Sequence, residues 1–210
     1  MAVVNGYATV EELRNHFGDT DPDALKLPLA DLERALNATS RAIEKHTARR
    51  FWRDPADALT TRTYVADDWY ELDVADISTD QGLVVTTDPN ADGNWSTTWS
   101  ASDLQMEPLN AAVDGGAYAW TRLVAASGRT WPVHARRATV RVTARHGWSE
   151  IPAEVNEACL LRAASIFKRR EAVFGVAGLN GFGEVRITRK DPDVVDLLHN
   201  FIRITVGVVG

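Results

Sequence analysis

Apolar residues recur at intervals of three and four over residues 29–50, which is the spacing of one face of a helix. The series consists of Leu29, Leu32, Leu36, Thr39, Ile43 and His46, with Ala35 and Ala42 beside it. Ahead of this series, Thr9 and Glu12 have the spacing of a capping box, which predicts a short helix that Gly18 ends. The first part of the chain is therefore expected to supply two helices, joined by a turn-rich linker.

The most apolar helical pattern covers residues 152–170 and opens the last third of the chain. Pro152 suits the first helical position, because an N–H group there would have no partner within the helix. The apolar residues occupy more than one face: Val155, Ala158, Cys159, Leu160, Leu161, Ala163, Ala164, Ile166 and Phe167. A helix that is apolar most of the way round is buried, so this helix is expected to be the core of a small bundle.

A glycine-punctuated loop follows at residues 175–183, and a short strand-like run covers residues 184–188. A last helix is expected from Asp191, whose side chain suits the N-cap, with Pro192 just inside it. The apolar positions of this helix are Val194, Leu197, Leu198 and Phe201. An uncharged, β-branched tail then covers residues 204–210.

Residues 54–150 have the pattern of strands, with β-branched and aromatic residues separated by turn sequences. Strands are expected at residues 62–65, 70–74, 82–87, 118–124 and 138–144. Six of the seven tryptophans lie in this segment, and packing in the core of the sheet is their expected role. These patterns predict an α+β protein: a small helical bundle built from the N- and C-terminal segments, with a β-rich, antiparallel insertion in the middle. The expected divisions are residues 1–53, 54–150 and 151–210.

The order of features in the last third carries a resemblance to a known family. A buried helix ends in Arg169-Arg170-Glu171, and the glycine-rich loop, a short strand and a helix that opens with Asp191-Pro192-Asp193 follow. Upstream, residues 104–110 and 140–148 extend the likeness, which covers about two thirds of the chain. This order resembles the head–tail connector (adaptor) proteins of long-tailed double-stranded DNA phages.

The resemblance implies a structural protein of the phage neck, assembled in the host cytoplasm and carried in the virion. Such adaptors form a homo-oligomeric, dodecameric ring beneath the portal protein and extend the DNA ejection channel. Double-stranded DNA would pass through the lumen without specific binding, and a head-closure (stopper) protein or the tail would dock on the ring. An alternative from another class is a β-rich module of a phage tail that binds a glycan or a receptor through its tryptophans.

Charge is distributed unevenly along the β-rich segment. Residues 54–114 carry 13 acidic side chains and a single basic one, Arg62, whereas residues 115–150 carry six arginines and one acid, Glu150. Two interpretations remain open: the opposite charges pair across one sheet, or the acidic surface of one subunit meets the basic surface of its neighbour. The net charge of −6 disfavours tight binding to DNA, which basic stripes support.

Residue patterns typical of catalysis or cofactor binding do not occur in the sequence. The five histidines have no metal-ligand spacing, and the glycine-rich loop lacks the Gly-Lys-Ser/Thr ending of a phosphate-binding loop. The single cysteine, Cys159, is expected to be a buried apolar side chain. Asp88, Asn90 and Asp92 match the start of a calcium loop, but Trp99 stands where the closing carboxylate should be, so a polar turn is expected. We therefore expect no enzyme activity, no cofactor, no metal, and neither a signal peptide nor a membrane span.

Two groups of residues are expected at interfaces with other proteins. The first would contact the portal or a neighbouring subunit and comprises Ile204, Val206, Val208, Val209, Gly178, Gly181 and Phe182. The second is an acidic face expected on the channel or between subunits, and it comprises Asp67, Asp68, Glu71 and Asp73. β-Branched residues suit addition to the edge of a partner's sheet, so the tail is expected to dock in this way.

Overall fold

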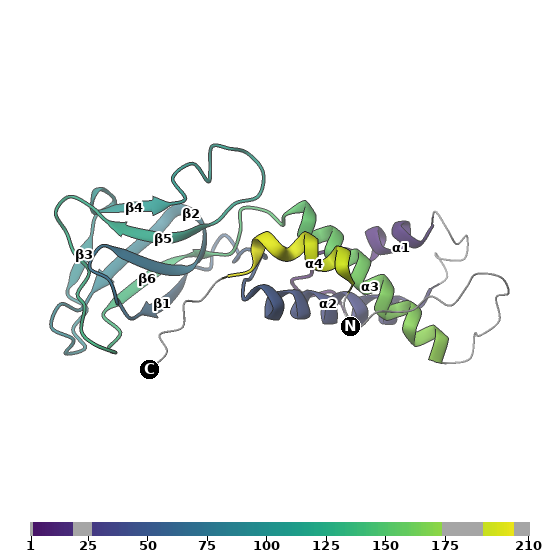
Figure 1. Ribbon diagram of the computed structural model, residues 1–210. Coiled ribbons are helices and arrows are strands. Elements are labelled where there is room, and N and C mark those ends of the chain that lie inside the picture. The colour runs from purple at the N-terminus through teal and green to yellow at the C-terminus, as the bar shows by residue number, and fades with distance from the viewer. Residues whose placement is uncertain (1, 19–26, 174–190, 204–210) are drawn as a thin grey trace. The chain divides into compact units, whose positions relative to one another are not determined.

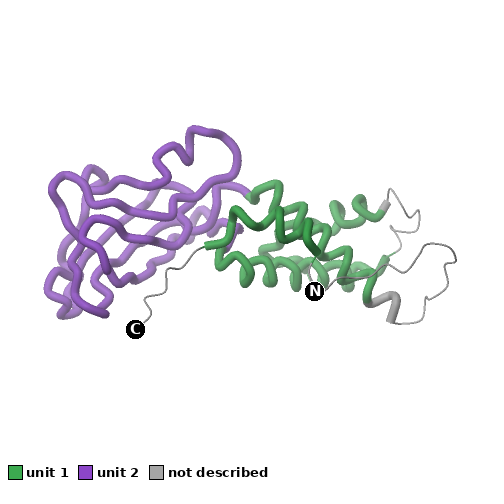
Figure 2. Tube along the Cα trace, viewed as in Figure 1, with its two compact units in different colours: residues 1–49, 151–210 green, residues 50–150 purple. Residues whose placement is uncertain are grey.

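The computed structural model describes residues 2–18, 27–173 and 191–203 (Figure 1). The chain divides into two compact units, residues 1–49 with 151–210, and residues 50–150 (Figure 2). The first, called the helical unit here, contains the α-helices, and the second, called the β unit, contains an antiparallel sheet. The predicted α+β class, with a bundle from the two ends of the chain and a β-rich insertion, is therefore confirmed.

Four α-helices form the described part of the helical unit. They are α1 (Val10–Gly18), α2 (Leu29–Thr47), α3 (Ala153–Val173) and α4 (Pro192–Leu198), and a 3₁₀ turn follows at His199–Phe201. Helix α3 packs against each of the other three. Its apolar side chains are buried on several faces, including Val155, Ala158 and Cys159, so its predicted place at the core is confirmed.

The predicted caps are present at two helix starts. The Glu12 N–H donates to Thr9 Oγ1 at 3.1 Å, and Glu12 Oε2 accepts the Thr9 N–H at 2.6 Å, which completes the capping box of α1. At α4, the Asp193 N–H donates to Asp191 Oδ1 at 3.1 Å. These local patterns set the starts of both helices.

Helix α2 differs from its prediction at its end and on its apolar face. It stops at Thr47 instead of Arg50, because Ala48 turns into the left-handed region (φ 53°) and the Thr47 carbonyl accepts the Arg203 N–H at 2.8 Å. His46 is exposed, whereas Thr47 is buried. With 3.6 residues per turn, Thr47, four residues after the buried Ile43, lies closer to the buried face than His46, which is three residues after Ile43. Leu29 is also exposed, so burial was wrongly expected for Leu29 and His46.

The β unit holds six strands, joined in the order β1-β6-β2-β5-β4, with β3 paired to β2. Every pair is antiparallel. The strands are β1 (Thr60–Tyr64), β2 (Glu71–Thr87), β3 (Thr97–Trp99), β4 (Leu104–Glu107), β5 (Trp120–Ala125) and β6 (Val140–His146). In Figure 1, β4 and β5 lie on one side of this unit and β1 lies on the other.

Strand β2 corrects the prediction of two separate strands at residues 70–74 and 82–87. It is one strand of 17 residues that pairs first with β5 and then with β6, and Ile77 has a partner in each. Its register shifts between Ile77 and Thr79 and again between Thr79 and Val84, as β-bulges produce. The bulges break the alternation of apolar and polar residues, so the sequence pattern divides a strand that is continuous. Strands β3 and β4 were not predicted, and both are short.

Two tryptophans form the centre of the β unit's core. The Trp99 and Trp131 rings stack with their centroids 4.2 Å apart, and both side chains are buried. Their indole N–H groups donate to Thr87 Oγ1 at 3.1 Å and to the Tyr70 carbonyl at 3.0 Å. A core role is confirmed for this pair, whereas it was wrongly expected for Trp69, which is 56% exposed.

Candidate interaction surfaces

The acidic residues at the start of β2 are partly neutralised within the sheet. Asp73 lies directly opposite Arg122 of β5, and its Oδ1 accepts from Arg122 Nε at 2.9 Å. Glu71 Oε2 lies 2.7 Å from Arg122 Nη1. Asp103 and Arg129 form a further pair at 3.4 Å. Pairing of opposite charges within one subunit, the first of the two interpretations, is therefore observed at these positions.

The connection between β1 and β2 presents a second kind of surface, which we call the acidic aromatic corner (Asp67–Glu71). Asp68 Oδ1 accepts the N–H groups of Glu71 at 2.9 Å and Tyr70 at 2.7 Å. These two backbone donors, that of Glu71 first, hold the pKa of Asp68 below its ordinary value. The corner is therefore a turn closed by its own carboxylate.

The backbone of the corner also bonds to the end of β5 and to the β5–β6 connection. The Trp131 N–H donates to the Trp69 carbonyl at 2.8 Å, and the Ala125 N–H donates to the Tyr70 carbonyl at 2.8 Å. The side chains of Trp69 and Tyr70 are nevertheless 56% and 58% exposed. A well-anchored backbone thus presents two large aromatic side chains to solvent. Sequence reasoning missed this feature, because tryptophans in a β segment are usually buried.

A third surface, the arginine face, covers the outward positions of β6 and β1. Along β6, Val140, Val142 and Ala144 are buried, and the residues between them are partly exposed. We define the arginine face by Arg141, Thr143 and Arg145 of β6 with Thr61 and Thr63 of β1. The hydroxyl groups of Thr61 and Thr143 lie 2.7 Å apart, and the guanidinium of Arg141 lies over the Trp95 ring, 4.0 Å from its centroid. This face carries positive charge and hydroxyl groups on regular strands.

A buried polar network joins the beginning and the end of the β unit. Asp54 is 3% exposed, and its carboxylate accepts from Arg50 Nη2 at 2.7 Å, Thr60 Oγ1 at 3.0 Å and the His146 N–H at 3.1 Å. Burial and the charge of Arg62 lower the pKa of His146, so its ring is neutral at pH 7. Since the carboxylate is occupied by these donors, the network is structural.

One small cavity among the helices leaves no room for a substrate. It lies between α2, α3 and α4, has a volume of about 70 Å³ and is lined by residues that include His46, Arg162 and Asp191, so it holds at most a few water molecules. Cys159 is buried 3.7 Å from Ser40 Oγ, and burial raises the pKa of its thiol to about 11. Such a thiol is protonated at pH 7 and unreactive.

The Asp88 segment is the polar turn that was predicted. Asp88 Oδ2 accepts the Gly93 N–H at 2.7 Å, and Oδ1 accepts the Asp92 N–H at 3.2 Å. Within residues 2–18, 27–173 and 191–203, no group of three or more histidine, cysteine or acidic residues could hold a metal ion. In the same residues, no helix is long and apolar enough to cross a membrane.

The first predicted interface group lies elsewhere in the chain. Ile204, Val206, Val208, Val209, Gly178, Gly181 and Phe182 all fall outside the described residues, as does the strand expected at 184–188. Of the second group, Asp67 and Asp68 belong to the acidic aromatic corner, Glu71 closes it, and Asp73 follows on β2. Glu71 and Asp73 both pair with Arg122, and the predicted face on the channel or between subunits stays a prediction.

The described residues form an α+β fold that presents an acidic aromatic corner and an arginine face. No protein-family model and no curated protein sequence matches the chain. Solved structures match its fold along nearly its whole length. A chain of the "Neck of empty GTA particle computed with C6 symmetry" has a TM-score of 0.59 at 18% identity. A chain of the "Neck of native GTA particle computed with C12 symmetry" has a TM-score of 0.54 at 20% identity.

A third match comes from the virion of a native gene transfer agent (GTA) particle, with a TM-score of 0.52 at 19% identity. In all three, the alignment covers 99% of this chain and 96% of the other. The match therefore extends over both the helical unit and the β unit. At these identities, the likeness establishes a shared fold.

Acid should destabilise the β unit through Asp103. Its carboxylate accepts the Ser100 N–H at 2.9 Å and the Ser100 hydroxyl at 2.8 Å and pairs with Arg129, and these interactions, the backbone bond first, lower its pKa. A carboxyl group with a lowered pKa in the folded state stabilises the fold above about pH 4, and this contribution is lost as the pH falls through the lowered value. We expect the melting temperature to drop below about pH 4, with a weaker dependence in Asp103→Asn. Parallel pH profiles for the two proteins, measured between pH 3 and 7, would contradict this assignment.

Proposed function

We propose that this chain is a ring-forming structural protein of the neck of a phage or phage-like particle, acting as the adaptor between the portal and the stopper or tail. The observation that carries the proposal is the match to neck chains over 99% of this chain and 96% of theirs. Those necks were computed with C6 and C12 symmetry, which supports a ring of identical subunits for this chain as well.

The physical character of the described residues supports a structural role. The buried polar groups of the β unit serve its fold, and the thiol of Cys159 is unreactive. The net charge of −6 suits a conduit through which DNA slides, because a surface rich in positive charge would hold the phosphates. We therefore propose a virion protein without enzymatic activity that contacts DNA only in passing.

The experiment that tests this function is cryo-electron microscopy of the protein mixed with portal-bearing heads. The adaptor role predicts a ring of this protein stacked on the portal and coaxial with it. A matched control uses heads that lack the portal, to which no ring should bind. Absence of any ring on portal-bearing heads would refute the proposed role.

The tail supplies a prediction that separates docking from folding. Residues 204–210 carry no charge and are rich in isoleucine and valine, which suits addition to a partner's sheet edge. We expect deletion of residues 204–210 to leave the melting temperature unchanged and to abolish attachment to portal-bearing heads. Substitution of Val206, Val208 and Val209 by serine, which keeps the length, should give the same loss. A truncated protein that melts much lower, or that attaches normally, would contradict docking by the tail.

A further inference from the structure

We propose that the β unit binds the β unit of a second copy of this chain head to tail, with the acidic aromatic corner of one copy on the arginine face of the next. The proposal rests on the proposed function, in which the chain forms a ring, and it assigns the contacting surfaces. It also joins the two interpretations of the charge pattern: some charges pair within the subunit, and those left over pair between subunits.

The corner has the properties of an interface anchor. Trp69 and Tyr70 are more than half exposed, although burial of a large aromatic side chain stabilises a protein or a complex by about 1.5–3 kcal/mol. Their backbone is held by bonds from Trp131 and Ala125, so little backbone entropy is lost when the side chains are covered. Tryptophan and tyrosine are enriched among the residues that dominate the energy of protein interfaces.

Negative charge remains around this anchor after the internal pairs are counted. Asp67, Asp68, Glu71 and Asp73 are four carboxylates, and Arg122 is the one guanidinium that pairs with any of them among the described residues. Asp67 is exposed, and the carboxylate of Asp68 accepts from the backbone N–H groups of its own turn. The corner and the start of β2 together therefore carry a net charge of −3, which favours a basic partner.

The arginine face carries the complementary charge. The guanidinium of Arg141 stacks on Trp95, and Arg145 Nε donates to the backbone carbonyl of Asp54, so neither is paired with a carboxylate among the described residues. Around them lie the exposed hydroxyl groups of Thr61 and Thr63, and Val84 of β2, opposite Thr143, is 44% exposed. An arginine that already stacks on one aromatic ring also suits contact with the aromatic side chains of the corner.

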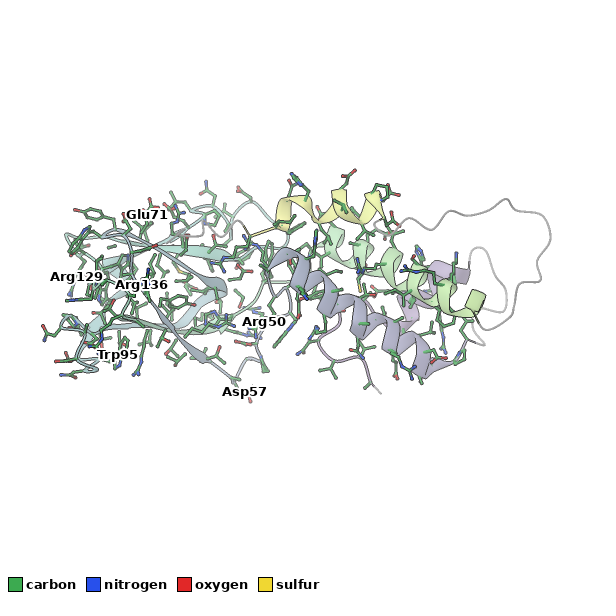
Figure 3. All side chains as sticks on the ribbon, turned by 60° about the horizontal axis from the view of Figure 1, so that its bottom comes forward. Arg50, Asp57, Glu71, Trp95, Arg129 and Arg136 are labelled. Atoms are coloured by element: carbon green, nitrogen blue, oxygen red, sulfur yellow. The ribbon has the colours of Figure 1, made fainter. Side chains whose placement is uncertain are left out.

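The two surfaces consist of different residues of the β unit, as a head-to-tail contact requires. In Figure 3, Glu71 of the corner and Trp95, over whose ring the Arg141 guanidinium lies, are well separated within this unit. A contact between two different patches is heterologous, so each copy keeps one free patch of each kind and a closed ring can form. The acidic residues predicted between subunits thus receive a specific partner.

Two charge-reversed variants test the contact. Asp67→Arg with Glu71→Arg reverses the corner and leaves the Asp73–Arg122 pair in place. Arg141→Glu with Thr63→Glu reverses the arginine face, at two positions directly opposite each other. Sedimentation velocity over a range of concentrations should show that each variant alone self-associates at least about tenfold more weakly than the wild type. Each variant alone should also bind portal-bearing heads more weakly than the wild type.

Mixing the two variants gives the decisive result. The reversed corner of one complements the reversed face of the other, and the unchanged patches also complement each other, so the equimolar mixture should recover wild-type oligomers. Asp57→Arg and Arg136→Glu are the matched controls, because both residues are exposed charges of the β unit outside the two surfaces (Figure 3). These controls should associate like the wild type, and circular dichroism should show all variants folded.

Each other outcome overturns a distinct statement. Reversed variants that form wild-type rings overturn this contact and leave the proposed ring intact. A mixture that stays dissociated overturns the head-to-tail pairing. A wild type that forms no oligomer, alone or on portal-bearing heads, overturns the proposed ring and this contact with it. Binding of a glycan on an array that Trp69→Ala abolishes, with oligomers unchanged, would assign the corner to a different partner.

Discussion

Replacement of Gly147 by alanine is expected to unfold the β unit under conditions in which the wild type stays folded. Gly147 follows β6 with a φ of 109°, and a Cβ atom there would lie 2.3 Å from the Trp52 carbonyl oxygen and 2.7 Å from Arg53 Cα. Both contacts are with backbone, which cannot move aside as a flexible side chain can. We expect a loss of about 3–5 kcal/mol in the free energy of unfolding, from backbone strain and the clash together.

Tryptophan fluorescence during urea denaturation measures this effect selectively, because all seven tryptophans lie within residues 50–150. Gly128→Ala is the matched control. Gly128 has a φ of 77°, but a Cβ atom added there would meet no other atom within 4 Å, so only the cost of a left-handed alanine remains, about 1 kcal/mol. Equal stabilities for Gly147→Ala and Gly128→Ala would show that the close approach of residues 52 and 53 does not constrain the fold.

Replacement of Asp54 by alanine should have the second large effect. The substitution removes the acceptor for Arg50 Nη2, Thr60 Oγ1 and the His146 N–H at a site that is 3% exposed. Removing one partner of a buried ion pair leaves the other uncompensated, so we expect a loss of about 3 kcal/mol, measured in the same urea titration.

Two further variants interpret the result at Asp54. Asp54→Asn keeps one oxygen acceptor and should lose less stability than alanine. Asp57→Ala, three residues along at an exposed position, should change stability by less than about 0.5 kcal/mol. If Asp54→Ala leaves the free energy of unfolding nearly unchanged, water replaces the carboxylate and the network does not stabilise the β unit.

The sequence by itself determined those elements whose causes are local. Thr9 with Glu12 and Asp191 with Pro192 mark the starts of α1 and α4, because a cap involves residues only two or three positions apart. The pattern of apolar residues all round α3 identified the core helix, because a helix that is apolar on several faces has to be buried on several faces. The α+β class follows from these periodicities, and so does the polar turn at Asp88.

Only the tertiary structure decided which tryptophans are buried and which charged residues pair. Trp69 and Trp131 lie in similar β-like stretches, yet the Trp131 ring is buried against Trp99 and the Trp69 ring is exposed. The backbones of Trp69 and Trp131 are nevertheless hydrogen-bonded to each other. Asp73 and Arg122 are 49 positions apart in sequence, and their pairing depends on the register of β2 on β5. The register of β2 shifts within its pairing with β6, and Gly147 is required only because residues 52 and 53 approach it. Such features arise from contacts between distant segments, and the periodicity of a single segment contains no information about the partner across the sheet.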